Sequence, residues 1–385
     1  MSNHLWRRNT AFSAAFLFAL LTAALTAASA SAANPSFAPA VNYPTGSLQG
    51  PGPAPVSTVA GDFNGDGMSD VAAADFGFAP KVLFNQGAGV FGAASNISGT
   101  SGVQSLAAGD VNADGRDDLV AMSPTRVYIL RGNANDTFTL LNSYTMFLGA
   151  QVQAILLDYN GDGRLDIAAQ TFFGIQTRRG NGNGSFSAGP FSIVPGASTL
   201  SAITDANING DADRDLFALD GLSSTTFALR GDGTGRFRVA GRLSLSGLIP
   251  EDVAAADLNG DGIDDVGVIG SFSFTVGFAL SNGLGGFSSF APATQFGGPG
   301  PTSLAFGDFN NDGNPDAVVS NVANVLDPSV LMFTGNGTAT PTNTGSLSVT
   351  DFPQNPAIAD FNGDGQDDVA VVGRSALSVL LNTTS

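Results

Sequence analysis

Cysteine is absent from the 385-residue sequence, and its single histidine and single tryptophan, His4 and Trp6, lie at the N-terminal end. Lys81 is the only lysine and Glu251 the only glutamate. Disulfides and cysteine-ligated zinc are therefore excluded. Beyond residue 33 there is also no imidazole, so catalysis by histidine or by a thiol is excluded from that part of the chain.

Positive charge is also scarce. Charged residues make up 12% of the sequence, with 33 acidic residues against 15 basic ones. This balance repels nucleic acid and anionic lipid, so neither is an expected partner. The 50 glycines and the 43% hydrophobic content are typical of a large all-β core joined by tight turns.

Residues 1–33 have the pattern of an export signal. Arg7 and Arg8 precede an apolar run at Phe16–Leu25, and Ala-Ser-Ala follows at 28–30 and again at 30–32. A membrane anchor is the alternative, but the run is short and rich in small residues, which favours a signal peptide. No other segment is apolar enough to span a membrane. We therefore expect a mature chain of residues 34–385 that is secreted, extracellular or periplasmic, and that has no membrane span.

The main feature of the sequence is a nine-residue acidic loop, written seven times at intervals of 48 to 52 residues. Loops 1 to 7 are Asp62–Asp70, Asp110–Asp118, Asp158–Asp166, Asn207–Asp215, Asp257–Asp265, Asp308–Asp316 and Asp360–Asp368. A fixed period of this length means that one supersecondary unit is repeated. Repeated units stack into one body, so residues 34–385 are expected to form a single domain.

The loops carry oxygen donors without nitrogen or sulfur ligands, which suits Ca²⁺. The expected ligands are the side chains at loop positions 1, 3, 5 and 9 and the backbone carbonyl at position 7. Position 1 is Asp62, Asp110, Asp158, Asn207, Asp257, Asp308 and Asp360. Position 3 is Asn64, Asn112, Asn160, Asn209, Asn259, Asn310 and Asn362. Position 5 is Asp66, Asp114, Asp162, Asp211, Asp261, Asp312 and Asp364. Position 7 is Met68, Arg116, Arg164, Asp213, Ile263, Asn314 and Gln366. Position 9 is Asp70, Asp118, Asp166, Asp215, Asp265, Asp316 and Asp368.

Charge and backbone freedom support a cation in each loop. Carboxylates packed this closely repel one another, and no cluster of Lys or Arg stands beside the loops in the sequence. Glycine at position 6 of six loops permits the turn that brings the position-7 carbonyl inward. We expect about six Ca²⁺ sites and a seventh of doubtful occupancy. The alternative is a set of Asx-rich turns that bind nothing.

The residues after each loop exclude an EF-hand. An EF-hand ends with Glu at position 12 and lies between helices. In this chain position 12 is Ala or Val in every copy, and each loop leads into an apolar run such as Val71–Ala74. Positions 2 and 10 are apolar throughout, which anchors the loop at both ends.

Each period contains four predicted strands, which in the first unit are Val56–Gly61, Val71–Ala74, Lys81–Phe84 and Phe91–Ile97. Seven such units favour an all-β, seven-bladed β-propeller, although a solenoid has similar periodicity.

The chain ends decide between these two folds. The seventh unit supplies Val369–Val372 and Ser375–Leu381 and then ends without its fourth strand. The segment Pro35–Gly46 resembles the fourth strands of other units and has no partners of its own. We therefore expect this N-terminal strand to complete the last blade and close the ring.

The loop pattern, followed by a Phe-Gly stretch such as Phe91-Gly92, resembles the FG-GAP/VCBS repeats, which also build the seven-bladed propeller of integrin α subunits. The resemblance covers essentially the whole mature chain. It implies that the loop joins the first two strands of each blade and binds Ca²⁺ through positions 1, 3, 5, 7 and 9. Loop 4 departs from the pattern, with Asn207 at position 1 and Ala212 in place of glycine.

The favoured interpretation is an exported, calcium-binding, monomeric propeller that serves as a non-catalytic binding or adhesion module for an extracellular protein or glycan. The candidate contact surface lies opposite the calcium loops, in Asp75–Pro80, Gln170–Gln176 and Ser320–Ser329. Phe76, Phe78, Phe172 and Phe173 are its candidate residues, and core packing is the alternative that is favoured for each. One alternative is a carbohydrate-binding lectin, although the mature chain lacks tryptophan platforms. The other is an extracellular polysaccharide lyase or hydrolase that uses Asp pairs or Lys81.

Overall fold

The computed structural model describes residues 33–45, 57–74, 79–100, 102–146, 153–245, 247–270, 275–295, 300–322, 328–350 and 352–384, with backbone alone at 293–295. The chain separates into Met1–Ala33 and Asn34–Ser385, and the second unit contains every described strand. The expected export signal lies outside the described residues except for Ala33. Across the described ranges there is no helix, and hence none that could cross a membrane.

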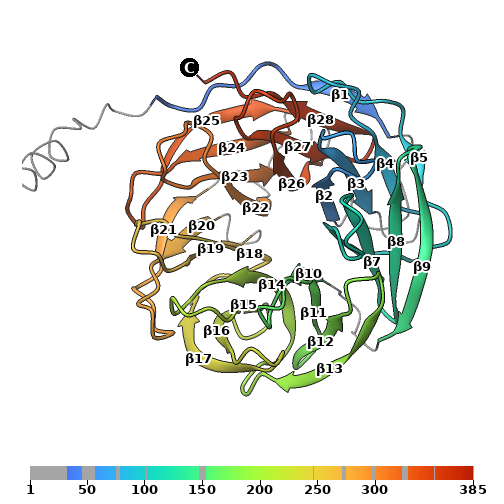
Figure 1. The fold of residues 1–385 in the computed structure, drawn as a ribbon. Coiled ribbons are helices and arrows are strands. Elements are labelled where there is room, and N and C mark those ends of the chain that lie inside the picture. Colours follow the sequence, from blue (N-terminus) through green and yellow to red (C-terminus); the bar gives the residue numbers. More distant parts are fainter. Residues whose placement is uncertain are drawn as a thin grey trace, which may run out of the picture. The chain divides into compact units, whose positions relative to one another are not determined.

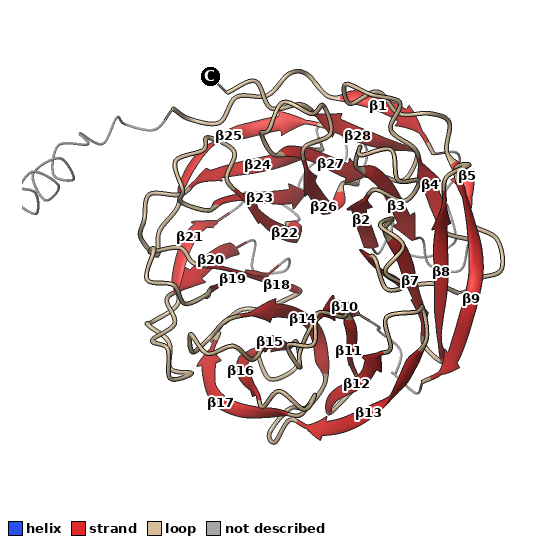
Figure 2. Ribbon diagram, viewed as in Figure 1, coloured by secondary structure: helices blue, strands red, loops and turns tan. Residues whose placement is uncertain are grey.

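Seven four-stranded antiparallel sheets follow one another around a ring as the blades of a propeller (Figures 1 and 2). From the axis outward, blade 1 is β2 (Ser57–Gly61), β3 (Asp70–Ala74), β4 (Lys81–Leu83) and β5 (Ser95–Asn96). Blade 2, in the same direction, is β6 (Ser105–Gly109), β7 (Asp118–Ser123), β8 (Arg126–Asn133) and β9 (Thr137–Thr145). Blade 3 is β10 (Ala154–Leu157), β11 (Asp166–Gln170), β12 (Gly174–Gly180) and β13 (Phe186–Ile193).

The remaining blades repeat this order. Blade 4 is β14 (Leu200–Ala206), β15 (Asp215–Asp220), β16 (Thr225–Gly231) and β17 (Phe237–Ser244). Blade 5 is β18 (Asp252–Ala256), β19 (Asp265–Gly270), β20 (Thr275–Ala279) and β21 (Ala291–Gln295). Blade 6 is β22 (Pro301–Gly307), β23 (Asp316–Asn321), β24 (Ser329–Thr334) and β25 (Thr342–Ser348). Blade 7 is β26 (Gln354–Ala359), β27 (Asp368–Val372), β28 (Ala376–Leu380) and β1 (Val41–Pro44).

The apolar runs after the acidic loops form the second strand of each blade, and every residue in these strands is buried. Neighbouring blades cover both faces of these strands, which explains why the runs are continuous rather than alternating. The hydrophobic core is accordingly divided into seven clusters, one between each pair of adjacent blades.

The N-terminal strand β1 is the outermost strand of blade 7, where it pairs antiparallel with β28. The N-terminal segment around β1 contacts both neighbouring blades, through Tyr43 in the strand and through Phe37 before it. The Tyr43 hydroxyl donates to the Gly89 carbonyl in blade 1 at 3.1 Å. The Phe37 ring packs edge-on to Phe309 of blade 6, with 5.5 Å between centroids.

The fourth strand of blade 1 is shorter than the predicted Phe91–Ile97. Only Ser95–Asn96 is a strand, and Phe91 forms an isolated bridge with Asn85. In blades 2 to 6 the pairing between the third and fourth strands shifts register at one point. In blade 1 the fourth strand is interrupted at the corresponding place, which leaves the isolated bridge at Phe91 and the short strand β5.

All seven acidic loops join the first strand of a blade to the second, so they lie on one face of the ring, the loop face. The turns between second and third strands, and the links from one blade to the next, lie on the opposite face. The innermost strands β2, β6, β10, β14, β18, β22 and β26 line an axial cavity of about 1080 Å³. Polar side chains at their starts join blades: Ser57 Oγ accepts the Leu106 N–H at 3.0 Å, and Ser303 Oγ that of Asn355 at 2.6 Å.

Candidate metal centres

The aspartate at position 9 begins the second strand of each blade and is fully buried in all seven copies. In loop 1, the Asp70 carboxylate accepts the Phe63 N–H at 3.1 Å and the Asn85 N–H at 2.8 Å. The other six copies accept the same two bonds, from position 2 of the loop and from the end of the third strand or just beyond it. The carboxylate therefore ties the loop to two strands of its own blade.

Burial makes these carboxyls hard to ionise. It raises the pKa of Asp70, Asp265 and Asp316 to about 7, although their backbone hydrogen bonds act in the opposite direction. The same cause raises the pKa of the other four copies, Asp118, Asp166, Asp215 and Asp368, to about 6. A bound cation would favour the charged form of each group.

The aspartate at position 1 organises the turn. In loop 1, the Asp62 carboxylate accepts the N–H groups of Gly65, Asp66 and Gly67 at 2.7, 3.1 and 2.8 Å. Gly67 has φ 85°, and the position-6 glycines of the other five loops are also left-handed. A Cβ at Gly67 would meet nothing within 4 Å, so glycine is used there for its backbone conformation rather than for space.

The asparagine at position 3 and the aspartate at position 5 face each other in most loops. The Asn64 amide donates to Asp66 Oδ2 at 3.0 Å, and loops 4, 5, 6 and 7 have the same bond at 2.9 to 3.1 Å. In loop 2 the Asn112 amide donates instead to Asp118 at 2.7 Å, and in loop 3 the Asn160 amide donates to Asp166 at 2.8 Å.

The loop side chains are oxygen donors of the kind that Ca²⁺ prefers, but in this structure they are not gathered around one point. Within the described ranges, no three His, Cys, Asp or Glu side chains stand close enough together to hold a metal ion. The carboxylates accept backbone N–H groups, yet an ionised carboxylate has about four acceptor sites, so each keeps capacity for a cation. Binding would require the carboxylates at positions 1, 5 and 9 to move toward one another and the position-7 carbonyl to join them.

Arginines do stand beside three of the loops, which corrects the expectation that no basic group is near. Arg116 Nη2 lies 2.6 Å from Asp114 Oδ2 in loop 2. Arg179 Nη2 lies 2.7 Å from Asp162 Oδ2 in loop 3, and Arg230 pairs with Asp211 of loop 4 at the same distance. Each of these carboxylates is at position 5. The arginine lowers the pKa of Asp162 and of Asp211, and the ion-pair hydrogen bond is the main cause in both.

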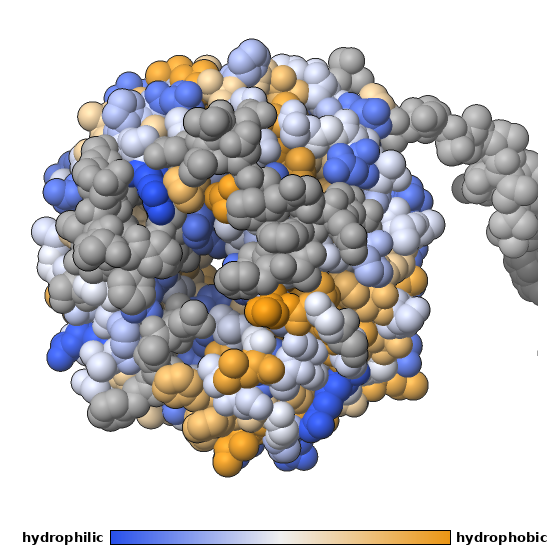
Figure 3. Space-filling view, turned by 180° about the vertical axis from the view of Figure 1, so that it is seen from behind, coloured by the Kyte–Doolittle hydropathy of each residue, from blue (hydrophilic) through white to orange (hydrophobic). Residues whose placement is uncertain are grey.

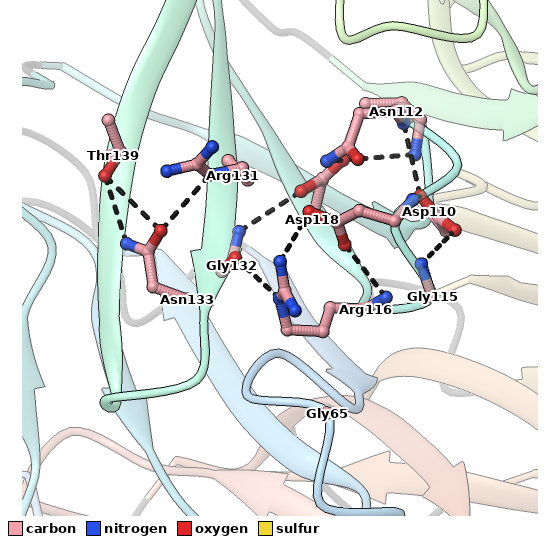
Figure 4. Close-up of polar contacts among 12 residues, drawn as sticks. Gly65, Asp110, Asn112, Gly115, Arg116, Asp118, Arg131, Gly132, Asn133 and Thr139 are labelled. Atoms are coloured by element: carbon pink, nitrogen blue, oxygen red, sulfur yellow. Dashed lines mark hydrogen bonds and ion pairs between the residues drawn. The ribbon is translucent and has the colours of Figure 1, made fainter.

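Figure 4 shows how the first of these arginines is placed. The Arg116 side chain extends from loop 2 toward the third strand of its blade, where its Nε donates to the Gly132 carbonyl at 3.1 Å. It also lies against loop 1, because a Cβ at Gly65 would be 2.7 Å from Arg116 Cγ. Arg131, on the third strand itself, bonds to Asn133 at 3.2 Å rather than to a loop carboxylate.

Loop 4 differs from the other six in backbone as well as in sequence. Ala212, a described residue, is not among the residues with positive φ, whereas glycine at this position is left-handed in every other loop. Asn207 Oδ1 still accepts the Gly210 N–H at 2.8 Å. Its amide donates to the Gly262 carbonyl of loop 5 at 3.2 Å, so this side chain is partly directed away from its own loop.

Two further positions matter that the sequence reasoning missed. Aspartate at position 8 of loops 2, 5 and 7 accepts the backbone N–H of position 1 in the preceding loop, as Asp117 does from Asp62 at 3.0 Å. The Asp-Asp pair that recurs at positions 8 and 9 was the sequence feature that could have pointed to this bond. Position 4 has positive φ in all seven loops, including Ala113 and Asn311.

Comparison with known proteins gives a family for the repeats. The family model described as an FG-GAP-like repeat matches residues 62–121, 110–169 and 207–268, and each match begins at the first residue of an acidic loop. No curated protein matches the chain significantly.

Several solved structures share the fold. One is an Agrocybe aegerita lectin studied for its recognition of non-reducing terminal N-acetylglucosamine, with 19% identity, a TM-score of 0.56 and 84% of each chain covered. BBS1N, crystallised with ARL6DN, has 11% identity, a TM-score of 0.66 and coverage of 91% of this chain and 98% of that one. A Lactobacillus plantarum protein has 10% identity, a TM-score of 0.56 and coverage of 85% and 95%.

At these identities the solved structures show the fold alone, and the repeats carry the relationship. The matched repeats start at loops 1, 2 and 4, and the same loop joins the first two strands of all seven blades. The chain is an FG-GAP repeat β-propeller.

Proposed function

We propose that this chain is an exported, calcium-stabilised propeller that acts as a non-catalytic binding or adhesion module for a protein or surface ligand. The calcium part of this proposal is supported by the oxygen donors repeated in the seven loops and by the buried aspartate at position 9 of each. A cation would supply the positive charge that these buried carboxylates lack and would fix the loop face of the ring.

The observation that carries the binding proposal is an exposed apolar surface on the opposite face, made of Phe172, Phe173, Leu222 and Ile249. Their exposed fractions are 42%, 58%, 76% and 54%. Figure 3 shows hydrophobic groups near the central hollow on this side of the molecule. Exposed apolar groups gathered on one face are typical of interaction sites.

Hydrogen bonds hold the loops that carry this surface. The Phe172 carbonyl accepts the Leu200 N–H at 3.0 Å, so the turn in blade 3 is joined to the first strand of blade 4. The Asp220 carboxylate accepts the N–H groups of Leu222 and Ser223, each at 3.0 Å. An ordered surface loses little conformational entropy when a partner binds.

The sequence offered Phe172 and Phe173 as candidates for this contact surface but favoured core packing for each, and it did not indicate Leu222 or Ile249. Phe76 and Phe78 lie outside the described residues, as does much of Ser320–Ser329.

The test is a pull-down from extracellular material with the mature chain, with and without calcium. Phe173→Ser with Leu222→Ser should abolish capture, whereas Ile193→Ser, an equally apolar change at a 65% exposed site on outer strand β13, should not. Capture that survives the double change, or capture of glycan alone through another surface, contradicts the proposed contact surface. Export is tested separately by sequencing the N-terminus of the secreted protein, which should begin near Asn34.

A further inference from the structure

The seven loops share one acidic pattern but differ in their electrostatic surroundings. Loops 2, 3 and 4, the arginine-paired loops, each have a guanidinium on the carboxylate at position 5. In the described residues no ion pair reaches an aspartate of loops 1, 5, 6 and 7, and in this sense they are called the arginine-free loops. Arg116 packs against loop 1, and the charge of Arg214 acts on Asp264 of loop 5, but neither forms an ion pair there.

In blades 3 and 4 the arginine comes from the third strand, whereas in blade 2 it is Arg116, at position 7 of the loop itself, and the equivalent strand residue, Arg131, bonds to Asn133. The backbone N–H groups of Gly180, Gly231 and Ser281 donate to the position-9 aspartates of their own loops, so these residues occupy equivalent places. The residue just before them is Arg179 in blade 3 and Arg230 in blade 4. In blade 5 it is Leu280, which bears no charge.

The sequence extends this contrast to whole blades. Eleven of the thirteen basic residues beyond residue 33 lie between 116 and 242, and residues 243–373 contain none. The eleven are Arg116, Arg126, Arg131, Arg164, Arg178, Arg179, Arg214, Arg230, Arg236, Arg238 and Arg242. Blades 5 to 7 therefore carry their acidic loops without basic side chains on the same blades, apart from Arg374 in the last turn.

In loops 2 and 3 the internal bonds also differ, whereas in loop 4 the Asn209 amide keeps its bond to Asp211 beside Arg230. In loops 1, 5, 6 and 7 the position-3 amide donates to position 5, and this neutral group can rotate to present its oxygen to a cation. In loops 2 and 3 that amide is directed to position 9, and the guanidinium takes its place at position 5. A guanidinium has no acceptor atom and repels a cation.

We propose that Arg116, Arg179 and Arg230 are internal counter-charges, which make loops 2, 3 and 4 weaker calcium sites, and less dependent on calcium, than loops 1, 5, 6 and 7. This inference rests on the proposed calcium function and concerns which loops the metal governs. The side chains of Arg179 and Arg230 are 55% and 56% exposed, so solvent screens the pairs. Screened pairs of this kind are expected to weaken calcium binding about three- to tenfold at each loop.

The test is hydrogen exchange measured by mass spectrometry on the mature chain, in calcium and in chelator, because exchange reports on each loop separately. Chelation should speed exchange in the arginine-free loops much more than in the arginine-paired loops. Arg179→Gln should make loop 3 as sensitive to chelation as loop 5. Arg131→Gln is the matched control, because Arg131 has in blade 2 the place that Arg179 has in blade 3 but bonds to Asn133 rather than to a loop carboxylate, and it should change nothing in loop 2.

The reverse substitution gives a second arm. Leu280→Arg places a guanidinium in blade 5 at the position of Arg230 and should weaken calcium binding at loop 5 about three- to tenfold. Leu280→Gln controls for the lost apolar side chain and should leave that affinity near the wild-type value.

The outcomes separate the two proposals. Equal protection of all seven loops by calcium, with no effect of Arg179→Gln or Leu280→Arg, overturns the counter-charge inference and leaves the calcium function standing. No effect of calcium on exchange in any loop overturns both.

Discussion

Blades 2 to 4 and blades 5 to 7 contain the same acidic loop but differ in the charges around it. In blades 2 to 4 a guanidinium neutralises one carboxylate of each loop, whereas the described residues of loops 5, 6 and 7 have no such partner. The strand pairings and the buried position-9 aspartate are nevertheless the same. The motif therefore determines the shape of the loop, and in our proposal the arginines determine how much the loop needs a cation.

Removing calcium is expected to have the largest effect on stability and to distinguish blades 2 to 4 from blades 5 to 7. Each site saturated at 100 times its Kd contributes about 2.7 kcal/mol to the folded state. Chelation should lower the Tm by many degrees, and proteolysis in chelator should begin in blades 5 to 7. Calorimetry and limited proteolysis measure this. An unchanged Tm in chelator would mean that the loops are turns that bind nothing.

Deleting Asn34–Gly46 should have the second-largest effect on stability. The deletion acts on blades 6, 7 and 1. The deletion removes β1, exposes the backbone of β28 and removes the contact between Tyr43 and Phe91, whose ring centroids lie 5.5 Å apart. Thermal denaturation of the shortened chain should show a much lower Tm than an ordinary terminal truncation gives. A deletion variant that melts like the complete mature chain contradicts the role of β1.

Matched substitutions at position 1 sharpen the comparison further. Asp62→Ala in loop 1 and Asp158→Ala in loop 3 both remove an acceptor of backbone N–H bonds, at a cost of about 1–3 kcal/mol. Asp62→Ala should also abolish a tight calcium site, whereas loop 3 keeps the pair between Arg179 and Asp162. Calcium titration of both variants should therefore show the larger loss for Asp62→Ala. A larger loss of calcium binding for Asp158→Ala would contradict the division into arginine-paired and arginine-free loops.

Repair of loop 4 should have the smallest effect. Asn207→Asp with Ala212→Gly restores the charge and the left-handed residue that the other loops have, and the glycine contributes about 1 kcal/mol if the usual turn forms. Calcium stoichiometry or Tm should rise, although Arg230 limits the gain. If loop 4 already binds calcium fully and the double substitution changes neither the calcium stoichiometry nor the Tm, then the residues at single loop positions do not determine calcium occupancy.

The fold was predictable because its determinants are local. The period, the apolar positions 2 and 10 and the continuous apolar runs give the blade and its buried second strand. Phe63 and Phe361, both at position 2, are buried between blades as such anchors should be. The shortened β5 was not predictable, because it depends on where the pairing of β4 and β5 is interrupted.

The surroundings of the site were less predictable than the loops. Arg179 is 17 residues from Asp162 and Arg230 is 19 from Asp211, so these pairs exist only after the third strand folds back. The bond from Asp117 to the Asp62 N–H joins two blades and depends on the ring. The exposure of Leu222 likewise follows from the arrangement of the opposite face rather than from any local pattern.

The most direct test of the calcium account is a count of bound metal. Mature protein dialysed against calcium and then analysed by elemental analysis should retain about six Ca²⁺ per chain, with loop 4 the weakest site. About two ions or fewer would contradict the reading of the loops as a calcium array.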